Sequence, residues 1–175
     1  MDDVEPQVET VGARLKVRDD HYCFGCGRLN PWGLKLSFYE SADGSGLWAQ
    51  WTPVRQHEGY DGIAHGGIVT TVLDEVMAWT AYRQRIWAVT GRIAVRFRRP
   101  VEIGVATRAS GRIVADRGRL LELAGELRRE SDGVVLAEAT GTFVRVAEEQ
   151  AGEWRRRYLG DISQEGKIAV VDANG

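Results

Sequence analysis

The chain has 175 residues, of which 43% are hydrophobic and 27% charged, and its net charge is −2. This length and balance indicate one globular domain with a core of its own and exclude an intrinsically disordered chain. The small net charge argues against binding to nucleic acid or to an anionic membrane, and no apolar run is long enough to cross a bilayer. Cys23 and Cys26 are too few for a disulfide scaffold, and the acidic start lacks the apolar core of a secretory signal. These features predict a cytoplasmic protein.

The first part of the chain predicts turns and two strands. The polar residues 1–20 predict a loose arm or a short helix, and the glycines and proline of 21–33 predict ordered turns. Alternating apolar residues predict strands over 34–40 and 46–52, joined by a turn. Residues 53–62 predict a loop.

The hydrophobic period then changes to that of a helix. Ile68, Val72 and Val76 share one helical face, and they predict a deeply buried helix over roughly 66–83. Four long strands are expected next, with hairpin turns at the Asp/Gly-containing breaks: 87–99, 102–115, 119–130 and 134–146. A terminal helix over 147–159 and a tail over 160–175 complete the chain.

This order of elements indicates an α+β domain in which an antiparallel curved sheet is wrapped around one long central helix. One helix covers only one face of such a sheet, so the other face or an edge must be covered by something else. Dimerisation with a second copy of the chain is the usual solution. The predicted organisation is an arm and turn segment (1–33), the sheet-and-helix domain (34–146), and a C-terminal helix and tail (147–175).

The most specific stretch is the glycine-rich loop 59–67, which runs into the helix through Gly66 and Gly67. The first N–H groups of a helix lack intrahelical acceptors and stabilise negative charge, so these glycines are candidates to polarise a carbonyl oxygen. Asp74 follows His65 by nine residues, which places the two on opposite sides of the helix and about 13 Å apart along it. They cannot act on one substrate atom within one chain. A site that uses both must therefore join two chains about a two-fold axis.

The His65-Gly66-Gly67 sequence before the helix, with Asp74 nine residues later, resembles the hotdog-fold acyl-CoA thioesterases of the phenylacetate-pathway and thioesterase-superfamily-member type. The run 89–104, with its proline and closing glycine, resembles a strand of those enzymes, and the opening 23–34 is similar to that of some members. The resemblance covers roughly 34–146. It implies the hotdog fold, hydrolysis of acyl-CoA thioesters without a cofactor or metal, and a homodimer or a dimer of dimers.

By position, the resemblance implies a role for each residue of the motif. Gly66 would donate its backbone N–H to the thioester carbonyl, with His65 helping to hold the loop and the substrate. Asp74 of the partner chain would act as general base or as nucleophile, and Thr90 would orient the attacking water. Partial burial of Asp74 is expected to raise its pKa toward neutrality, which suits a base.

One position departs from the family pattern, because some relatives carry asparagine where this chain has Gly59; Asp61 and His57 are the candidates to replace it. A cluster of arginines around the helix exit and the next strand indicates either a solvated strand face or contacts to coenzyme A phosphates: Arg83, Arg85, Arg92, Arg96, Arg98 and Arg99. The substrate-binding candidates are Gly67, Asp61, Arg96, Arg98 and Arg99.

Several of these residues also fit simpler structural roles. His65 fits a simple helix cap, Thr90 an ordinary strand residue, and Glu75 is an alternative base beside Asp74. The spacing of Cys23 and Cys26 is that of metal or redox pairs, but with only His21 nearby a structural turn is favoured. As a function, a non-catalytic acyl-CoA-binding or regulatory hotdog protein is the main alternative. A hotdog dehydratase fits less well, because the segment before the helix is not rich in proline.

Overall fold

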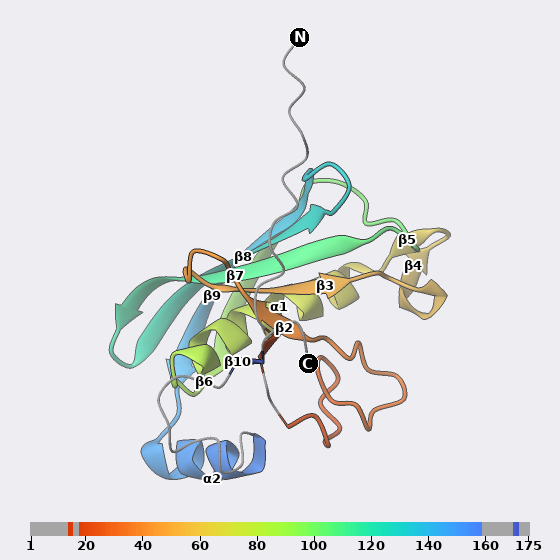
Figure 1. The fold of residues 1–175 in the computed structure, drawn as a ribbon. Coiled ribbons are helices and arrows are strands. Elements are labelled where there is room, and N and C mark those ends of the chain that lie inside the picture. The colour runs from red at the N-terminus through yellow and green to blue at the C-terminus, as the bar shows by residue number, and fades with distance from the viewer. Residues whose placement is uncertain (1–13, 16–17, 159–169, 172–175) are drawn as a thin grey trace.

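The computed structural model describes residues 14–15, 18–158 and 170–171 (Figure 1). In this part of the chain the helices are α1 (Gly66–Arg83) and α2 (Glu148–Tyr158), with a short 3-10 turn at Arg55–His57. One sheet has the order β10-β1-β2-β3-β7-β8-β9-β6, and every neighbouring pair is antiparallel. Its strands are β1 (Arg14–Leu15), β2 (Phe38–Glu40), β3 (Leu47–Trp51), β6 (Ala88–Phe97), β7 (Thr107–Arg117), β8 (Leu120–Arg129), β9 (Val135–Arg145) and β10 (Val170–Val171). A separate hairpin pairs β4 (Glu58–Tyr60) with β5 (Ile63–Ala64).

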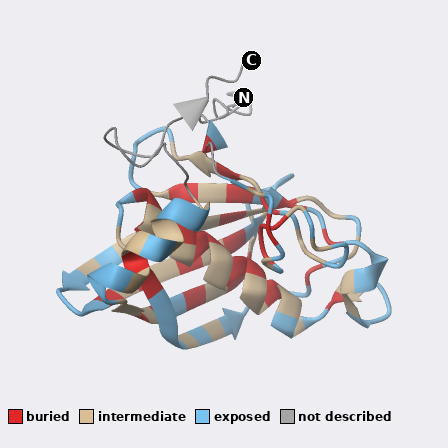
Figure 2. Ribbon diagram, turned by 90° about the horizontal axis from the view of Figure 1, so that it is seen from below, coloured by how far each residue is buried: buried red, intermediate tan, exposed pale blue. Residues whose placement is uncertain are grey.

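Helix α1 packs along one face of this sheet, and the buried residues concentrate where the two meet (Figure 2). Glycines in the sheet allow the close approach: a Cβ on Gly111 would lie 2.8 Å from the carbonyl oxygen of Val76, and one on Gly125 would lie 3.1 Å from Cγ of Met77. The core therefore lies chiefly between α1 and the sheet strands β3, β6, β7, β8 and β9.

The predicted architecture is confirmed, namely an α+β hotdog arrangement of an antiparallel curved sheet and one central helix. The helix expected over 66–83 has those bounds, and the expected terminal helix is α2. The two hairpin turns are also present, with Gly118 and Gly133 at φ +73° and +68°, a region that glycine adopts without steric cost.

Two strands begin later than their apolar pattern indicated. The strand expected from Leu34 starts at Phe38, because Lys35 adopts a left-handed φ of 54° that interrupts extended backbone. The strand expected from Glu102 starts at Thr107. The chain before it is bound to the β4–β5 hairpin, since Ala64 N–H donates to the Val101 carbonyl at 2.8 Å, and it then turns at Gly104.

The shortest strands were not predicted from the sequence. The loop expected over 53–62 contains the 3-10 turn and β4. The expectation of a loose arm or helix was wrong for Arg14–Leu15, and that of a tail was wrong for Val170–Val171, since these segments pair as β1 and β10 beyond the short strand β2. Residues 18–20 of the predicted arm have irregular backbone, whereas 1–13, 16–17, 160–169 and 172–175 lie outside the described residues. The division into three segments stays a prediction.

Arg83, at the end of α1, belongs to the core rather than to an anion-binding surface. Its guanidinium is buried and forms an ion pair with Glu40 of β2, with Nε donating to Oε1 at 2.7 Å. The pair links the helix to the sheet. Among the clustered arginines, Arg83 therefore has a structural role.

We expect Glu40→Gln to lower the free energy of unfolding by roughly 3 kcal/mol, because removing one partner leaves a buried charge without compensation. Urea unfolding of the variant measures the loss. Glu122→Gln, which removes the carboxylate that an exposed Arg117 contacts, is the matched control and should change stability by less than about 1 kcal/mol. An equal effect of the two substitutions would contradict the assignment of Arg83 to the core.

Candidate functional site

The start of α1 is organised by His65, the residue that caps the helix. His65 has an extended backbone (φ −62°, ψ 133°), and its Nδ1 accepts a hydrogen bond from the Gly67 N–H at 2.9 Å. Its carbonyl accepts the N–H of Ile68, and its own N–H donates to the carbonyl of His57. Because Nδ1 is an acceptor, the proton of the neutral ring resides on Nε2. His65 thus holds the loop and the helix start together.

The same bonds distinguish the two glycines. Gly67 N–H is already used by His65, so it is not a donor to a substrate. Gly66 is the first helical residue, and its N–H has no intrahelical acceptor. A Cβ on Gly66 would lie 3.3 Å from Cζ of Phe97, a residue at the end of β6 that is 52% exposed. Gly66 N–H is therefore the donor at the helix start for which the described residues provide no acceptor.

The departure at Gly59 has a steric reason. A Cβ there would lie 2.9 Å from Cα of His65 and 3.2 Å from its ring carbon Cδ2, so strand β4 packs directly against His65. Neither of the two expected replacements bonds to the His65 side chain within the described residues; the backbone carbonyl of His57 accepts the His65 N–H. His57 accepts a hydrogen bond from Val54 N–H, and burial lowers its pKa; Asp61 is exposed at the hairpin tip.

Asp74 and Thr90 form the second part of the site. The Thr90 hydroxyl donates to Oδ1 of Asp74 at 2.7 Å, and Oδ2 receives no hydrogen bond from the described residues. Burial raises the pKa of Asp74, and the bond from Thr90 acts in the opposite direction. The expected direction of the pKa change thus agrees with the half-buried position of the carboxyl. Thr90 binds the carboxylate itself, a contact that the sequence did not reveal.

Both parts of the site lie along the edge strand β6. Thr90, near the start of β6, contacts Asp74, and Phe97, at its end, lies over Gly66. Strand β6 therefore runs back along α1 toward the helix N-terminus. Within one chain His65 and Asp74 are not brought together, as the helical spacing predicted.

The arginines expected to contact coenzyme A lie elsewhere in the single chain. Arg96 and Arg98 line a groove of about 970 Å³ together with Glu126 and Arg128 of β8. These β8 residues alternate with buried Leu127 and Leu123, so the groove is on the sheet face that points away from α1. Within one chain, the groove and Asp74 therefore lie on opposite sides of the sheet.

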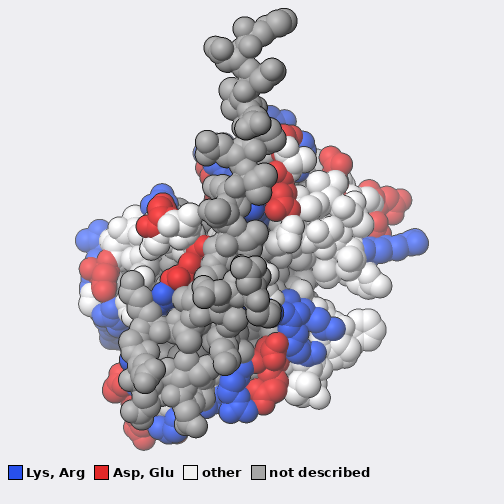
Figure 3. Space-filling model, in the orientation of Figure 1, with Lys and Arg blue, Asp and Glu red and all other residues white. Residues whose placement is uncertain are grey.

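The arginines also differ in their partners. Arg98 donates from Nε to Glu138 at 2.6 Å, whereas Arg96 and Arg99 form no ion pair within the described residues. In the view of Figure 3, basic and acidic side chains lie interspersed and no broad patch of one sign is visible. This distribution agrees with the small net charge.

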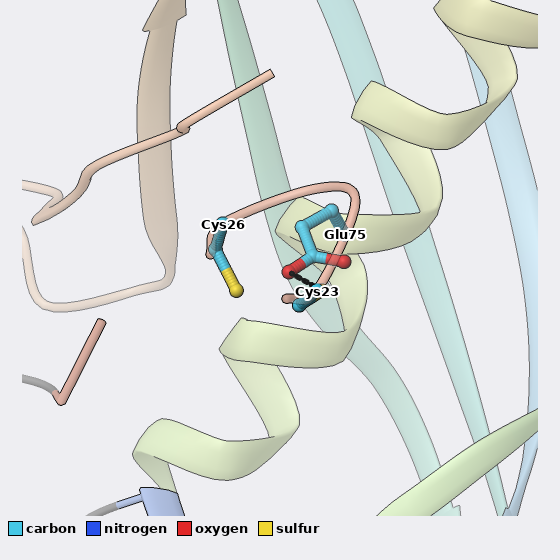
Figure 4. A group of neighbouring side chains, drawn as sticks. All are labelled: Cys23, Cys26 and Glu75. Atoms are coloured by element: carbon cyan, nitrogen blue, oxygen red, sulfur yellow. Dashed lines mark hydrogen bonds between the residues drawn. The ribbon is translucent and has the colours of Figure 1, made fainter. Parts of the chain in front are cut away.

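Glu75, the alternative base, is used differently. Its carboxylate receives the Trp79 indole N–H at 3.1 Å and lies 3.7 Å from Sγ of Cys23, with Cys26 alongside (Figure 4). Its contacts are therefore with the N-terminal turn and not with Thr90. The spacing of Cys23 and Cys26 is visible in the sequence as that of a metal or redox pair. Nothing in the sequence links Cys23 to Glu75, which lies much further along the chain.

No helix among the described residues has the length and apolar character needed to span a membrane.

The family model of the thioesterase superfamily matches residues 61–136. No curated protein matches the chain. Among solved structures, a thioesterase superfamily protein is similar at 23% identity and a TM-score of 0.66; the match covers 70% of this chain, and the chain spans only 60% of that protein. The PaaI protein of the E. coli phenylacetic acid degradation operon is 18% identical with a TM-score of 0.59, covering 65% of this chain and 81% of PaaI. A Streptococcus mutans protein bound to acetyl-CoA is 20% identical with a TM-score of 0.56, covering 59% and 82%. The match to the thioesterase superfamily model thus runs from the β4–β5 turn into β9, and the sheet and helix have the hotdog fold of these thioesterase structures.

Proposed function

We propose that this chain hydrolyses acyl-CoA thioesters to the free acid and coenzyme A, in a site that two copies of the chain form together. The observation that carries the proposal is the pair of groups along β6: the available N–H of Gly66 and the half-buried carboxylate of Asp74 held by Thr90. The Gly66 N–H can stabilise the oxyanion that develops on the thioester carbonyl, and the Asp74 carboxylate can accept a proton from water. The Streptococcus mutans structure, which contains acetyl-CoA, supports the ligand class.

The edge position of β6 supports the assembly. Strand β6 ends the sheet, is ten residues long, and exposes Val89 and Phe97 at 43% and 52%. A long, partly apolar edge is a surface for strand pairing. Antiparallel pairing of two β6 strands about a two-fold axis near Ile93 sets the Thr90 end of one copy opposite the Phe97 end of the other. This places Gly66 of one chain beside the partner's Asp74.

In the proposed reaction, Gly66 N–H binds the thioester carbonyl oxygen, and the partner's Asp74 takes a proton from water. The water oxygen bonds to the carbonyl carbon, and negative charge builds on the oxygen beside Gly66. The C–S bond then breaks, and the coenzyme A thiolate receives the proton from Asp74. His65 acts through Gly67 by keeping the helix start in place.

We propose that arginines near the end of β6 contact the coenzyme A phosphates. Arg96 and Arg99 are the stronger candidates, because Arg98 is paired with Glu138. Asp61, exposed at the hairpin tip beside the helix start, is kept as a proposed substrate contact. The cytoplasm is the proposed location.

Thiol release from a panel of aliphatic and aromatic acyl-CoAs, with the purified full chain, tests the proposed function. Turnover of at least one thioester by a dimer or tetramer is expected. Stoichiometric binding of acyl-CoA without thiol release would contradict hydrolysis and favour the non-catalytic binding protein.

The pH profile gives a separate test of Asp74 as base. Because burial raises its pKa and only the carboxylate accepts a proton, kcat/KM should fall with decreasing pH through a value above that of an ordinary aspartate. Thr90→Val removes the bond that lowers this pKa, so the acid limb should move to higher pH. Thr90→Ser, which keeps the hydroxyl, should leave it near the original position. A limb that does not move in Thr90→Val would contradict the assignment.

A further inference from the structure

A cluster outside the proposed hydrolytic site joins the N-terminal turn to α1. Ligand atoms of Cys23, Cys26 and Glu75 all lie within 4.8 Å of one another, and Figure 4 shows the three side chains converging from the turn and the helix. We propose that Cys23, Cys26 and Glu75 bind a divalent metal ion of the zinc class that fastens this turn to the helix. We call these three residues the cysteine cluster.

The turn is shaped for this convergence by two glycines. Gly27 N–H donates to the Cys23 carbonyl at 2.9 Å, and a side chain at Gly27 would collide with the backbone of His21 and Cys23. A side chain at Gly25 would collide with the carboxyl of Glu75. The turn therefore closes tightly on itself and packs directly against Glu75.

The two sulfur atoms are placed away from bulk solvent, since Cys26 is buried and Cys23 is partly buried. Metals bind cysteine as the thiolate, so an ion in the cysteine cluster would displace the thiol protons of Cys23 and Cys26.

The charge of the cysteine cluster favours a cation. Glu75 is partly buried, and its carboxylate lies against the two cysteine side chains. None of the ion pairs formed by the described residues places a lysine or arginine on this carboxylate. Buried anionic groups without a basic partner are costly, and a bound cation removes that cost.

The ligand types select the metal. Two sulfur ligands favour zinc over magnesium or calcium, and zinc with three protein ligands takes water in the fourth position. His21 is not the fourth ligand, because its Nδ1 accepts the Cys23 N–H and its Nε2 lies 3.0 Å from the Arg18 carbonyl. Trp79 N–H on Oε1 orients the Glu75 carboxylate, as outer-sphere donors do at metal sites.

The sequence alone favoured a structural turn with no metal, because two cysteines are only half of a usual zinc site. The structure adds Glu75 from α1. The inference does not depend on the proposed hydrolysis, since metal content is measured without a substrate.

Titration of the reduced, metal-stripped full chain with Co²⁺ is the test. We expect one Co²⁺ per chain with sulfur-to-cobalt charge-transfer absorption, displaced by Zn²⁺, and a rise in Tm with added Zn²⁺. Glu75→Gln keeps both thiols and the side-chain shape, and it should weaken Co²⁺ binding by at least about tenfold. Cys26→Ser should abolish the charge-transfer band. Glu138→Gln, an exposed carboxylate outside the cysteine cluster, is the control that should bind as the wild type does.

Absence of stoichiometric Co²⁺ binding in the reduced wild type would overturn the proposal. So would binding that Glu75→Gln leaves unchanged. A thiol pair that is oxidised by glutathione disulfide to an intramolecular disulfide, with no metal bound by the reduced form, would also overturn it and assign Cys23 and Cys26 to redox chemistry.

Discussion

Asp74→Asn is expected to lower kcat/KM for thioester hydrolysis by about 10²- to 10⁴-fold, the usual contribution of a positioned base. The substitution keeps the shape of the side chain, and the Thr90 hydroxyl can still donate to the amide oxygen. Because burial raises the pKa of Asp74, the ionised carboxylate is disfavoured in the fold, and a neutral side chain should not lower Tm. The loss should therefore appear in turnover and not in stability.

Steady-state thiol release together with thermal unfolding separates these effects. Asp132→Asn, at the exposed turn between β8 and β9, is the matched control and should keep wild-type activity. Unchanged turnover of every accepted thioester by Asp74→Asn would remove Asp74 from the mechanism. In a single turnover in H₂¹⁸O, label on the Asp74 carboxyl would identify Asp74 as the nucleophile, because a base leaves its carboxyl unlabelled.

Gly66→Pro is expected to lower kcat by about 10²- to 10³-fold, because it deletes the one N–H that the helix start leaves available. Proline is well accepted as the first residue of a helix, and His65 already has the extended backbone that proline requires before it. The variant should therefore fold with α1 intact, which circular dichroism can verify.

The matched control for this substitution is Gly66→Ala. Alanine adds the same Cβ, 3.3 Å from the Phe97 ring, but keeps the N–H. It should lose much less activity than proline. If the two variants lose activity equally, the cause is crowding at Phe97, and the role of Gly66 N–H in binding the oxyanion is wrong.

The sequence predicted the parts of the fold that depend on long local patterns. The apolar face of α1 and the glycines at its start are continuous in the chain, so the helix had the expected bounds. The hairpins at Gly118 and Gly133 followed from residues that accept positive φ. The two-residue strands β1 and β10 have no such pattern, because they exist only through pairing with each other and with β2.

The site was predictable only in part for the same physical reason. The helical period separated His65 from Asp74, and the structure keeps them apart. Contacts between distant segments were not predictable: the bond from Thr90 to Asp74, and the approach of Cys23 to Glu75, depend on how strand and turn pack on α1. The capping bond that uses up Gly67 N–H likewise needed the backbone geometry.

The central claim is that each site combines the helix start of one chain with the partner's Asp74, and mixing two inactive variants tests it most directly. Gly66→Pro and Asp74→Asn chains are co-expressed with different tags, and the mixed dimers are compared with each parent. A shared site leaves one of the two sites in a mixed dimer intact, so a random mixture should recover about one quarter of wild-type turnover. If Gly66 and Asp74 of the same chain act together, every site carries one substitution, and turnover no higher than that of the parents would contradict the shared site.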